Sequence, residues 1–215
     1  MVVVEPTDAT AQPDVQSGVQ SGVQSGVQTD DQSSDQSAGS RLILVSGPAR
    51  SGKSRWAEHL LKDHPLVTYI ATAANRPDDL DWQKRLALHR QRRPDHWQLA
   101  ESGGQLVETI EALRPGQSVL IDALGGFVAH HLELDSSTWS HLCNRLLACL
   151  SSSGCTCVLV IEETGWGVVP PTRVGGLFRD RLGALAQQLD READAAWLVL
   201  QGRALDLHAL GHGVP

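Results

Sequence analysis

The stretch Arg41–Asp63, RLILVSGPARSGKSRWAEHLLKD, decides the fold of this chain. Four of its residues stand in the G-x-x-x-x-G-K-S spacing typical of a phosphate-binding loop: Gly47, Gly52, Lys53 and Ser54. The apolar run Leu42–Val45 precedes this loop and predicts a strand. A helical pattern follows it, with an apolar side made of Trp56, Ala57, Leu60 and Leu61. Strand, loop and helix therefore come in the order that a phosphate-binding loop requires.

The residue types in this loop suit a polyphosphate ligand. Glycines let successive backbone N–H groups turn toward an anion, and the N-terminus of the following helix adds its positive dipole end. Lys53 can reach the terminal phosphates. Loops rich in glycine and serine also serve as plain connections, but the full spacing favours binding. We predict that the nucleotide contacts Gly47, Pro48, Ala49, Arg50, Ser51, Gly52, Lys53 and Ser54.

Composition divides the chain of 215 residues into two parts. Residues 1–40 contain the repeat VQSGVQSGVQSGVQ, which has too little hydrophobic surface to fold, so we expect a disordered low-complexity tail. Six of the 25 acidic residues precede Arg41 and none of the 18 basic ones does. The net charge of −7 therefore belongs mostly to the tail, and it does not favour a nucleic-acid or anionic-membrane surface. Residues 41–215 are expected to form one nucleotide-binding catalytic domain.

The sequence favours a soluble, cytoplasmic protein. The N-terminus lacks the basic and apolar segments of a secretory signal, and no apolar run is long enough to span a bilayer. The cysteines show no metal-binding spacing, so we expect buried free thiols at Cys143, Cys149, Cys155 and Cys157.

Apolar runs alternate with helical patterns after the loop. Strands are predicted at Leu66–Ala71, Ser118–Leu124, Thr156–Ile161 and Ala196–Leu200. Helices are predicted at Asp78–Arg93, Gln105–Leu113, Trp139–Leu150 and Leu177–Ala193. The segment Trp97–Glu101 is short and mixed. This alternation predicts an α/β fold with a mainly parallel sheet and helices on both faces, and ligands at the carboxyl ends of its strands.

Two residues are candidates for holding Mg²⁺. Asp122 follows a buried strand, where phosphate-loop proteins place the carboxylate that holds the metal, directly or through water. The hydroxyl of Ser54 is the second candidate. An aspartate at the end of a strand is also a common turn residue, and this interpretation of Asp122 stays open.

His89 lies on a cationic stripe of a predicted helix. Arg85, His89 and Arg92 recur at i, i+4 and i+7 and share a face. A helical histidine between arginines is commonly a solvated surface residue. The arginines would also lower the pKa of the imidazole, keep it neutral and nucleophilic, and attract phosphates. Spacing alone does not decide between these two interpretations.

The sequence resembles the bifunctional adenosylcobinamide kinase and adenosylcobinamide-phosphate guanylyltransferase family from about Arg41 to about Leu207. The matching segments occur in the family's order: SGPARSGKSRWAE, YIATA, RLALHRQRRPDHW, VLIDAL, EETGWGVVP and FRDRLGALAQ. The R-x-x-x-H-R-x-x-R-P-x-x-W stretch and the G-x-G-V-V-P segment, expected to form a lid, are more specific than the phosphate-binding loop.

The resemblance implies a late step of cobalamin biosynthesis. Such enzymes phosphorylate adenosylcobinamide with ATP or GTP, then transfer GMP from GTP to that phosphate through a guanylylated histidine, here His89. The family's nucleotide contacts would fall on the loop Gly47–Ser54 and on Thr72, Arg90, Gln91, Arg92, Arg93, Glu101 and Asp122. The fold would be a RecA-like P-loop NTPase assembled as a homotrimer, with Mg²⁺ as the metal.

The chain departs from the family pattern in several segments. The family usually has Asn-Glu-Val-Gly where Glu162–Gly165 stand, and Thr-Leu-Trp where Gly125–Phe127 stand. It also has an arginine and an asparagine where Ala184 and Ala186 stand. These departures leave the phosphate-binding residues intact and bear on corrinoid recognition and on the kinase half-reaction. Two alternatives stay open: a P-loop small-molecule kinase only, and a nucleotide-binding regulator without turnover.

Overall fold

The computed structural model describes residues 40–214, except residues 75, 168 and 169 and the side chain of Arg85. The predicted tail, apart from Ser40, lies outside the described residues. So do Val168 and Val169 of the predicted lid and the arginine side chain that was expected to start the cationic stripe.

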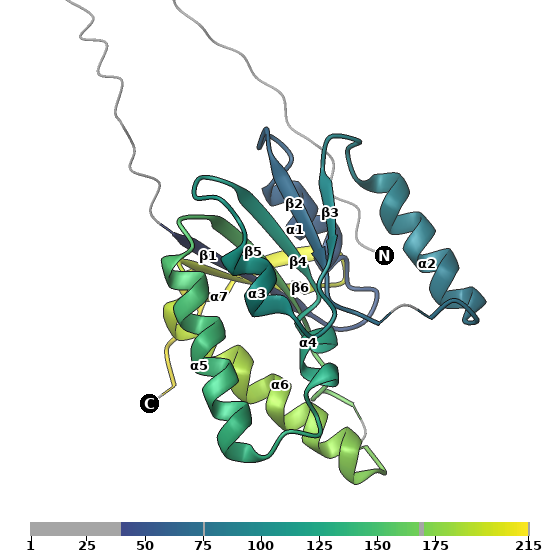
Figure 1. Ribbon diagram of the computed structural model, residues 1–215, viewed down its shortest axis with the longest axis vertical. Coiled ribbons are helices and arrows are strands. Elements are labelled where there is room, and N and C mark those ends of the chain that lie inside the picture. The colour runs from purple at the N-terminus through teal and green to yellow at the C-terminus, as the bar shows by residue number, and fades with distance from the viewer. Residues whose placement is uncertain (1–39, 75, 168–169, 215) are drawn as a thin grey trace, which may run out of the picture. The chain divides into compact units, whose positions relative to one another are not determined.

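The described residues form one sheet of seven strands in the order β3-β2-β4-β5-β1-β6-β7 (Figure 1). The strands are β1 (Arg41–Gly47), β2 (Val67–Ala71), β3 (Gln98–Glu101), β4 (Ser118–Asp122), β5 (Thr156–Glu162), β6 (Ala195–Leu200) and β7 (Arg203–Asp206). All neighbours pair in parallel except β7, which pairs antiparallel with β6. Parallel strands bring the carboxyl ends of β1, β2, β4 and β5 to one edge of the sheet.

Seven helices accompany the described sheet. They are α1 (Lys53–Leu60), α2 (Leu80–Arg92), α3 (Leu106–Glu111), α4 (Leu124–His130), α5 (Ser136–Ser152), α6 (Arg173–Glu192) and α7 (Leu207–Leu210). Side chains of Asp79, Asp135 and Thr172 accept backbone hydrogen bonds at the N-termini of α2, α5 and α6. In this part of the chain, none of the helices has the length and apolar character needed to span a membrane.

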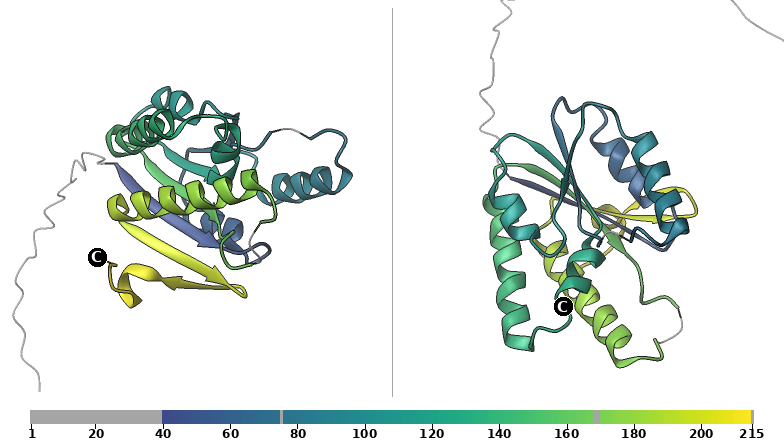
Figure 2. Two further views of the ribbon diagram at one scale, coloured as in Figure 1. Left: turned by 90° about the horizontal axis from the view of Figure 1, so that it is seen from below. Right: turned by 45° about the vertical axis from the view of Figure 1, so that its right-hand side comes forward.

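Alternate residues of β1 pack into the hydrophobic clusters on opposite faces of the sheet. Leu42 and Leu44 pack in a cluster with residues of α3, α4, α5 and α6, whereas Ile43 and Val45 pack with Ala57 of α1. The views agree that α5 and α6 cover one face of the sheet while α1 lies on the other (Figures 1 and 2). A sheet buried on both faces explains the continuous apolar runs of its central strands. The predicted α/β fold, with a mainly parallel sheet and helices on both faces, is confirmed.

Several predicted boundaries were wrong. The strand predicted to run to Leu124 ends at Asp122, and Leu124 begins α4. The mixed segment Trp97–Glu101 contains the strand β3. Helix α6 begins at Arg173, four residues before the predicted start at Leu177, because Thr172 caps it. The antiparallel strand β7 was not predicted.

The four cysteines are buried free thiols, as expected. Burial raises the pKa of Cys143 and Cys149 to about 11 and that of Cys157 to about 12. Cys143, Cys149 and Cys157 therefore remain protonated at neutral pH and act as small apolar groups in the core.

Arg181 is a buried cation that ties α6 to the segment between α4 and α5. Its guanidinium donates to the carbonyl oxygens of His131 at 2.7 Å and Leu134 at 2.5 Å, and it lies 5.0 Å from the ring centre of Trp139. We expect Arg181→Met to lower the free energy of unfolding by about 3 kcal/mol, because two carbonyl groups lose a charged donor. Urea denaturation measures this loss.

Arg179 on the same helix provides the matched control. It pairs with the adjacent Asp180, whose side chain is 68% exposed, so Arg179→Met should cost less than about 1 kcal/mol. Equal losses in the two variants would contradict the bridging role given to Arg181.

Candidate active site

The phosphate-binding loop begins where β1 ends, at Gly47, and leads directly into α1 at Lys53. Arg50 and Gly52 take positive φ values of 61° and 105°, which turn the backbone sharply between strand and helix. The ammonium group of Lys53 donates to the carbonyl oxygen of Pro48 at 3.2 Å, so the lysine reaches back across the loop. This is the predicted strand-loop-helix arrangement, with its cation directed at the loop.

The turn between β6 and β7 supports this loop from the side. The N–H of Gly202 donates to the carbonyl oxygen of Ser51 at 3.0 Å. A Cβ at Gly47 would collide with the carbonyl of Val199 and lie 2.8 Å from Oγ of Ser51, so this glycine permits the close approach of β6. Oγ of Ser51 is buried and has no hydrogen-bond partner among the described residues. Such an atom inside the loop suits a ligand rich in acceptor oxygens.

Asp122 ends β4, which is two strands away from β1 with β5 between them. Asp122 is level with Val45, two residues before the end of β1 at Gly47. At about 4.8 Å between neighbouring strands and about 3.3 Å per residue along a strand, the ends of β4 and β1 lie roughly 12 Å apart. One bound triphosphate can span that interval. The aspartate and the phosphate-binding loop therefore face the same stretch of the sheet edge.

The oxygen donors at this edge fit Mg²⁺. This ion commonly takes only one or two protein oxygens and completes its shell with substrate phosphates and water. Ser54 in the first turn of α1 and Asp122 at the end of β4 offer a hydroxyl and a carboxylate, which are hard ligands of the required kind. Among the described residues there is no cluster of three or more histidine, cysteine or acidic side chains that could hold a metal by itself.

His89, in the last turns of α2, points at Asp122. Its Nδ1 lies 3.6 Å from Oδ2 of Asp122 and 3.3 Å from Nη2 of Arg92. The side chain of His89 is only 31% exposed, so it is not the fully solvated residue of the first interpretation. The structure thus brings the imidazole to the sheet edge that also carries the phosphate-binding loop.

The pKa of His89 is lowered from its usual value, first by burial and then by Arg92 and Arg93, while Asp122 and Glu58 raise it. The sequence predicted this direction from the arginines alone. The largest cause is burial of the ring, which no spacing on a helix reveals. A lowered pKa keeps the imidazole neutral, as a nucleophile requires.

Tyr69 contacts Asp122, and Arg93 contacts both Tyr69 and the backbone of His89. The hydroxyl of Tyr69 donates to Oδ2 of Asp122 at 2.8 Å. Burial, followed by the charge of Asp122, raises the pKa of Tyr69, so this hydroxyl stays protonated. The guanidinium of Arg93 lies 4.0 Å from the ring centre of Tyr69 and donates through Nε to the carbonyl oxygen of His89 at 3.3 Å.

The remaining predicted nucleotide contacts occupy different environments. Arg90, Gln91 and Glu101 are exposed. Thr72 is fully buried, and its hydroxyl donates to the carbonyl oxygen of Ala123, which joins β2 to the start of α4. The guanidinium of Arg92 is engaged by Glu58 of α1, a pairing across 34 residues that the sequence analysis missed.

Glu162 is a second carboxylate at this edge of the sheet. It contacts Gly125, and both residues stand where the family usually has other residues. It lies opposite Gly47 in the parallel pairing of β5 with β1, and its Oε2 accepts from the N–H of Gly125 at 2.9 Å. A Cβ at Gly125 would lie 2.7 Å from that oxygen, so this rotamer of Glu162 requires glycine. Burial raises the pKa of Glu162, whereas its hydrogen bonds and Lys53 lower it.

We expect Glu162→Gln to raise the melting temperature at neutral pH. A carboxyl whose pKa is raised by folding binds more protons when folded, so its contribution to stability falls as pH rises above its unfolded pKa. Glutamine keeps the acceptor for Gly125 and carries no charge. The gain should vanish below about pH 4.3, the ordinary glutamate pKa, in thermal melts over a pH series. Exposed Glu133→Gln is the control, and destabilisation by Glu162→Gln at neutral pH would contradict this account.

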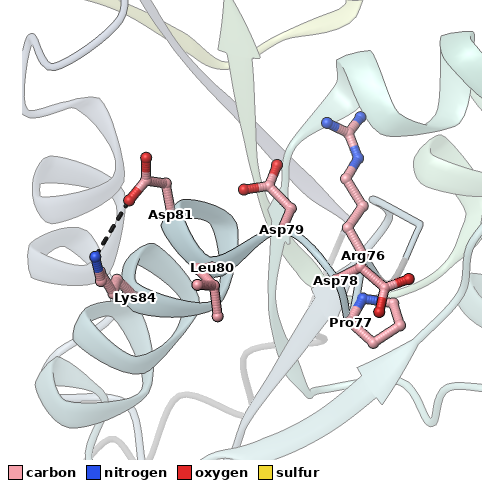
Figure 3. Close-up of a pocket in the computed structure, with 7 residues that line it drawn as sticks. All are labelled: Arg76, Pro77, Asp78, Asp79, Leu80, Asp81 and Lys84. Carbon is pink, nitrogen blue, oxygen red and sulfur yellow. Dashed lines mark hydrogen bonds and ion pairs between the residues drawn. The ribbon is translucent and has the colours of Figure 1, made fainter.

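A separate hollow lies at the other end of α2, and Figure 3 shows its lining. It is formed by Arg76, Pro77, Asp78, Asp79, Leu80, Asp81 and Lys84. Lys84 pairs with Asp81 at 3.3 Å, and Asp79 caps α2. The phosphate-binding loop, His89 and Asp122 are not part of this hollow, which is open and carries mixed charges.

Comparisons with known proteins agree with this site. Residues 43–207 match the family described as cobinamide kinase / cobinamide phosphate guanyltransferase. The chain is 36% identical over 176 residues to the bifunctional adenosylcobalamin biosynthesis protein CobU of Escherichia coli (strain K12), covering 75% of this chain and 96% of that protein. It is 34% identical over 167 residues to the bifunctional adenosylcobalamin biosynthesis protein CobP of Pseudomonas aeruginosa, covering 76% and 95%.

A solved structure supports the fold alone. An ATPase from the type III secretion system of pathogenic bacteria superposes with a TM-score of 0.52 at 10% identity, covering 81% of this chain and 59% of that chain. The described residues thus share the fold of this ATPase.

Proposed function

The chain belongs to the cobinamide kinase / cobinamide phosphate guanyltransferase family, and we propose that its guanylyl transfer proceeds through a covalent intermediate on His89. Its relatives are bifunctional enzymes of cobalamin biosynthesis, and this chain is a kinase and guanylyltransferase of the same kind. The observation that supports the proposal is the placement of the His89 imidazole 3.6 Å from Asp122, at the sheet edge where the phosphate-binding loop also begins.

In the first half-reaction, the hydroxyl oxygen of adenosylcobinamide attacks the γ-phosphorus of ATP or GTP. The hydroxyl proton is released and the nucleoside diphosphate leaves. The loop amides and Lys53 hold the triphosphate and offset the charge that develops on the leaving group. Ser54 and Asp122 would hold Mg²⁺, which supplies further charge neutralisation when bound.

In the second half-reaction, a neutral nitrogen of His89 attacks the α-phosphorus of GTP, and pyrophosphate leaves. A phosphate oxygen of adenosylcobinamide phosphate then attacks the same phosphorus, which breaks the P–N bond and frees the imidazole. One displacement is thereby divided into two. The lowered pKa of His89 supports the first step, because a protonated ring could not attack.

Product analysis after incubation with adenosylcobinamide, GTP and Mg²⁺ tests this function. We expect adenosylcobinamide-GDP and pyrophosphate. Adenosylcobinamide phosphate as the end product would favour the kinase-only alternative, and unconsumed GTP would favour a regulator. The family resemblance also implies a homotrimer, and composition implies a cytoplasmic protein with a disordered tail. These stay predictions.

A further inference from the structure

Tyr69 and Asp122 come from neighbouring strands and meet on one face of the sheet. β2 and β4 pair in parallel with Ala71 opposite Asp122, so Tyr69, two residues before Ala71, lies on the same face as the carboxylate. Its hydroxyl donates to Oδ2 of Asp122 at 2.8 Å. Tyr69 is 6% exposed and the side chain of Asp122 is 11% exposed, so little water competes for this contact. A hydrogen bond from a shielded hydroxyl to a carboxylate is stronger than one between neutral groups.

The ring of Tyr69 is held by contacts that do not involve its hydroxyl. The guanidinium of Arg93 lies 4.0 Å from the ring centre, and the ring belongs to the apolar cluster that contains Leu61 and Trp97. These contacts fix the position of the hydroxyl relative to Asp122. Phenylalanine at this position would keep the ring and lose only the donor.

The two oxygens of Asp122 have different surroundings. Both polar contacts that the described residues make with this carboxylate are with Oδ2, which accepts from Tyr69 and lies 3.6 Å from Nδ1 of His89. A hydrogen bond to one oxygen of a ligating carboxylate orients the group and tunes its affinity for the metal. Oδ1 is therefore the oxygen available to Mg²⁺.

We propose that Tyr69 is a positioning residue for Mg²⁺ binding: its hydroxyl holds Oδ2 of Asp122, so that the carboxylate offers Oδ1 to the metal that accompanies the nucleotide. This inference rests on the metal role proposed for Asp122. It adds a residue that neither the sequence pattern nor the family match assigns.

Mg²⁺ titrations of both half-reactions compare the wild-type protein with Tyr69→Phe and Asp122→Asn. In Tyr69→Phe we expect the Mg²⁺ concentration for half-maximal rate to rise by about 10-fold, the lower end of the effect of removing a hydrogen-bond partner of a metal ligand. Saturating Mg²⁺ should restore a rate close to that of the wild-type protein. Asp122→Asn should raise the requirement further, because it removes the charge of the ligand itself.

Ser118→Ala is the matched control. Ser118 is buried at the start of β4, and its hydroxyl is hydrogen-bonded to Nδ1 of His64. The variant therefore removes a buried hydroxyl from the strand that carries Asp122, at the end away from the site. It should lower the melting temperature and leave the Mg²⁺ requirement unchanged.

Metal binding can also be followed without turnover. Tyr69 is the only tyrosine of the chain, so protein labelled with ¹³C in its tyrosine ring gives signals from this residue alone. With α,β-methylene-GTP, which cannot transfer GMP, Mg²⁺ should shift these signals in the wild-type protein and leave them in place in Asp122→Asn. Mn²⁺ titration followed by EPR, with the same analogue, should show the loss of metal affinity in Tyr69→Phe.

Two results would overturn the inference while the metal role of Asp122 stands. One is wild-type metal affinity in Tyr69→Phe when Asp122→Asn binds metal weakly. The other is a loss of rate in Tyr69→Phe that saturating Mg²⁺ does not restore. Wild-type metal affinity in Asp122→Asn would instead remove the premise, and the inference with it. The covalent intermediate on His89 is tested separately by labelling, so these failures are distinguishable.

Discussion

Lys53→Ala should lose both half-reactions, each by about 10²- to 10³-fold, the scale seen when one preorganised charge donor is removed. Lys53 begins α1 and directs its ammonium across the phosphate-binding loop to the carbonyl of Pro48. In the proposed mechanism, both reactions require a triphosphate held in that loop. Initial rates of adenosylcobinamide phosphorylation and of pyrophosphate release measure the two losses.

Lys62→Ala is the matched control for this lysine. Lys62 follows the same helix, and its side chain is 57% exposed, so neither rate should change. If Lys53→Ala still transferred GMP to His89 at the wild-type rate, the two reactions could not share one nucleotide site.

His89→Ala should separate the two activities. Guanylyl transfer should fall by at least about 10⁴-fold, the scale of losing a covalent nucleophile, because no other group replaces the attacking nitrogen. Phosphorylation of adenosylcobinamide should persist, since it uses the phosphate-binding loop. Chromatography of the corrinoid products should therefore show adenosylcobinamide phosphate accumulating.

His208→Ala controls for loss of a histidine elsewhere. His208 lies in α7 and pairs with Asp190 at 3.1 Å. It should leave both products unchanged. If His89→Ala still formed adenosylcobinamide-GDP at the wild-type rate, His89 would not be the nucleophile of guanylyl transfer.

The central strands and the loop were predictable because their signals are local. A strand buried on both faces is a continuous apolar run, as in β1, β4 and β5. The glycines of the loop are recognisable because a sharp turn needs backbone conformations that glycine adopts readily. Edge strands lack this signal. β3 and β7 are four residues long, with three exposed residues in β3 and two in β7, and each strand pairs with a single neighbour. Helix α4 was hidden by Gly125 and Gly126, which lower helix propensity and are required by contacts with Glu162 and Thr72.

The residues of the candidate site likewise fall into those with a local sequence signal and those without one. The sequence predicted His89, Lys53 and Asp122 because spacing or strand ends mark them. It did not predict Glu58 or Tyr69, whose partners lie 34 and 53 residues away and are found only after the sheet is assembled. It also attributed the lowered pKa of His89 to the arginines, whereas burial is the larger cause.

The most direct measurement is the fate of α-labelled GTP. Incubation of the wild-type protein with α-labelled GTP and Mg²⁺, followed by denaturation, should leave acid-labile and base-stable label on the peptide that carries His89. γ-Labelled GTP in a parallel reaction should leave none there, because pyrophosphate departs. Label that survives in His89→Ala, or wild-type protein that turns over adenosylcobinamide phosphate without ever acquiring label, would contradict the two-step transfer.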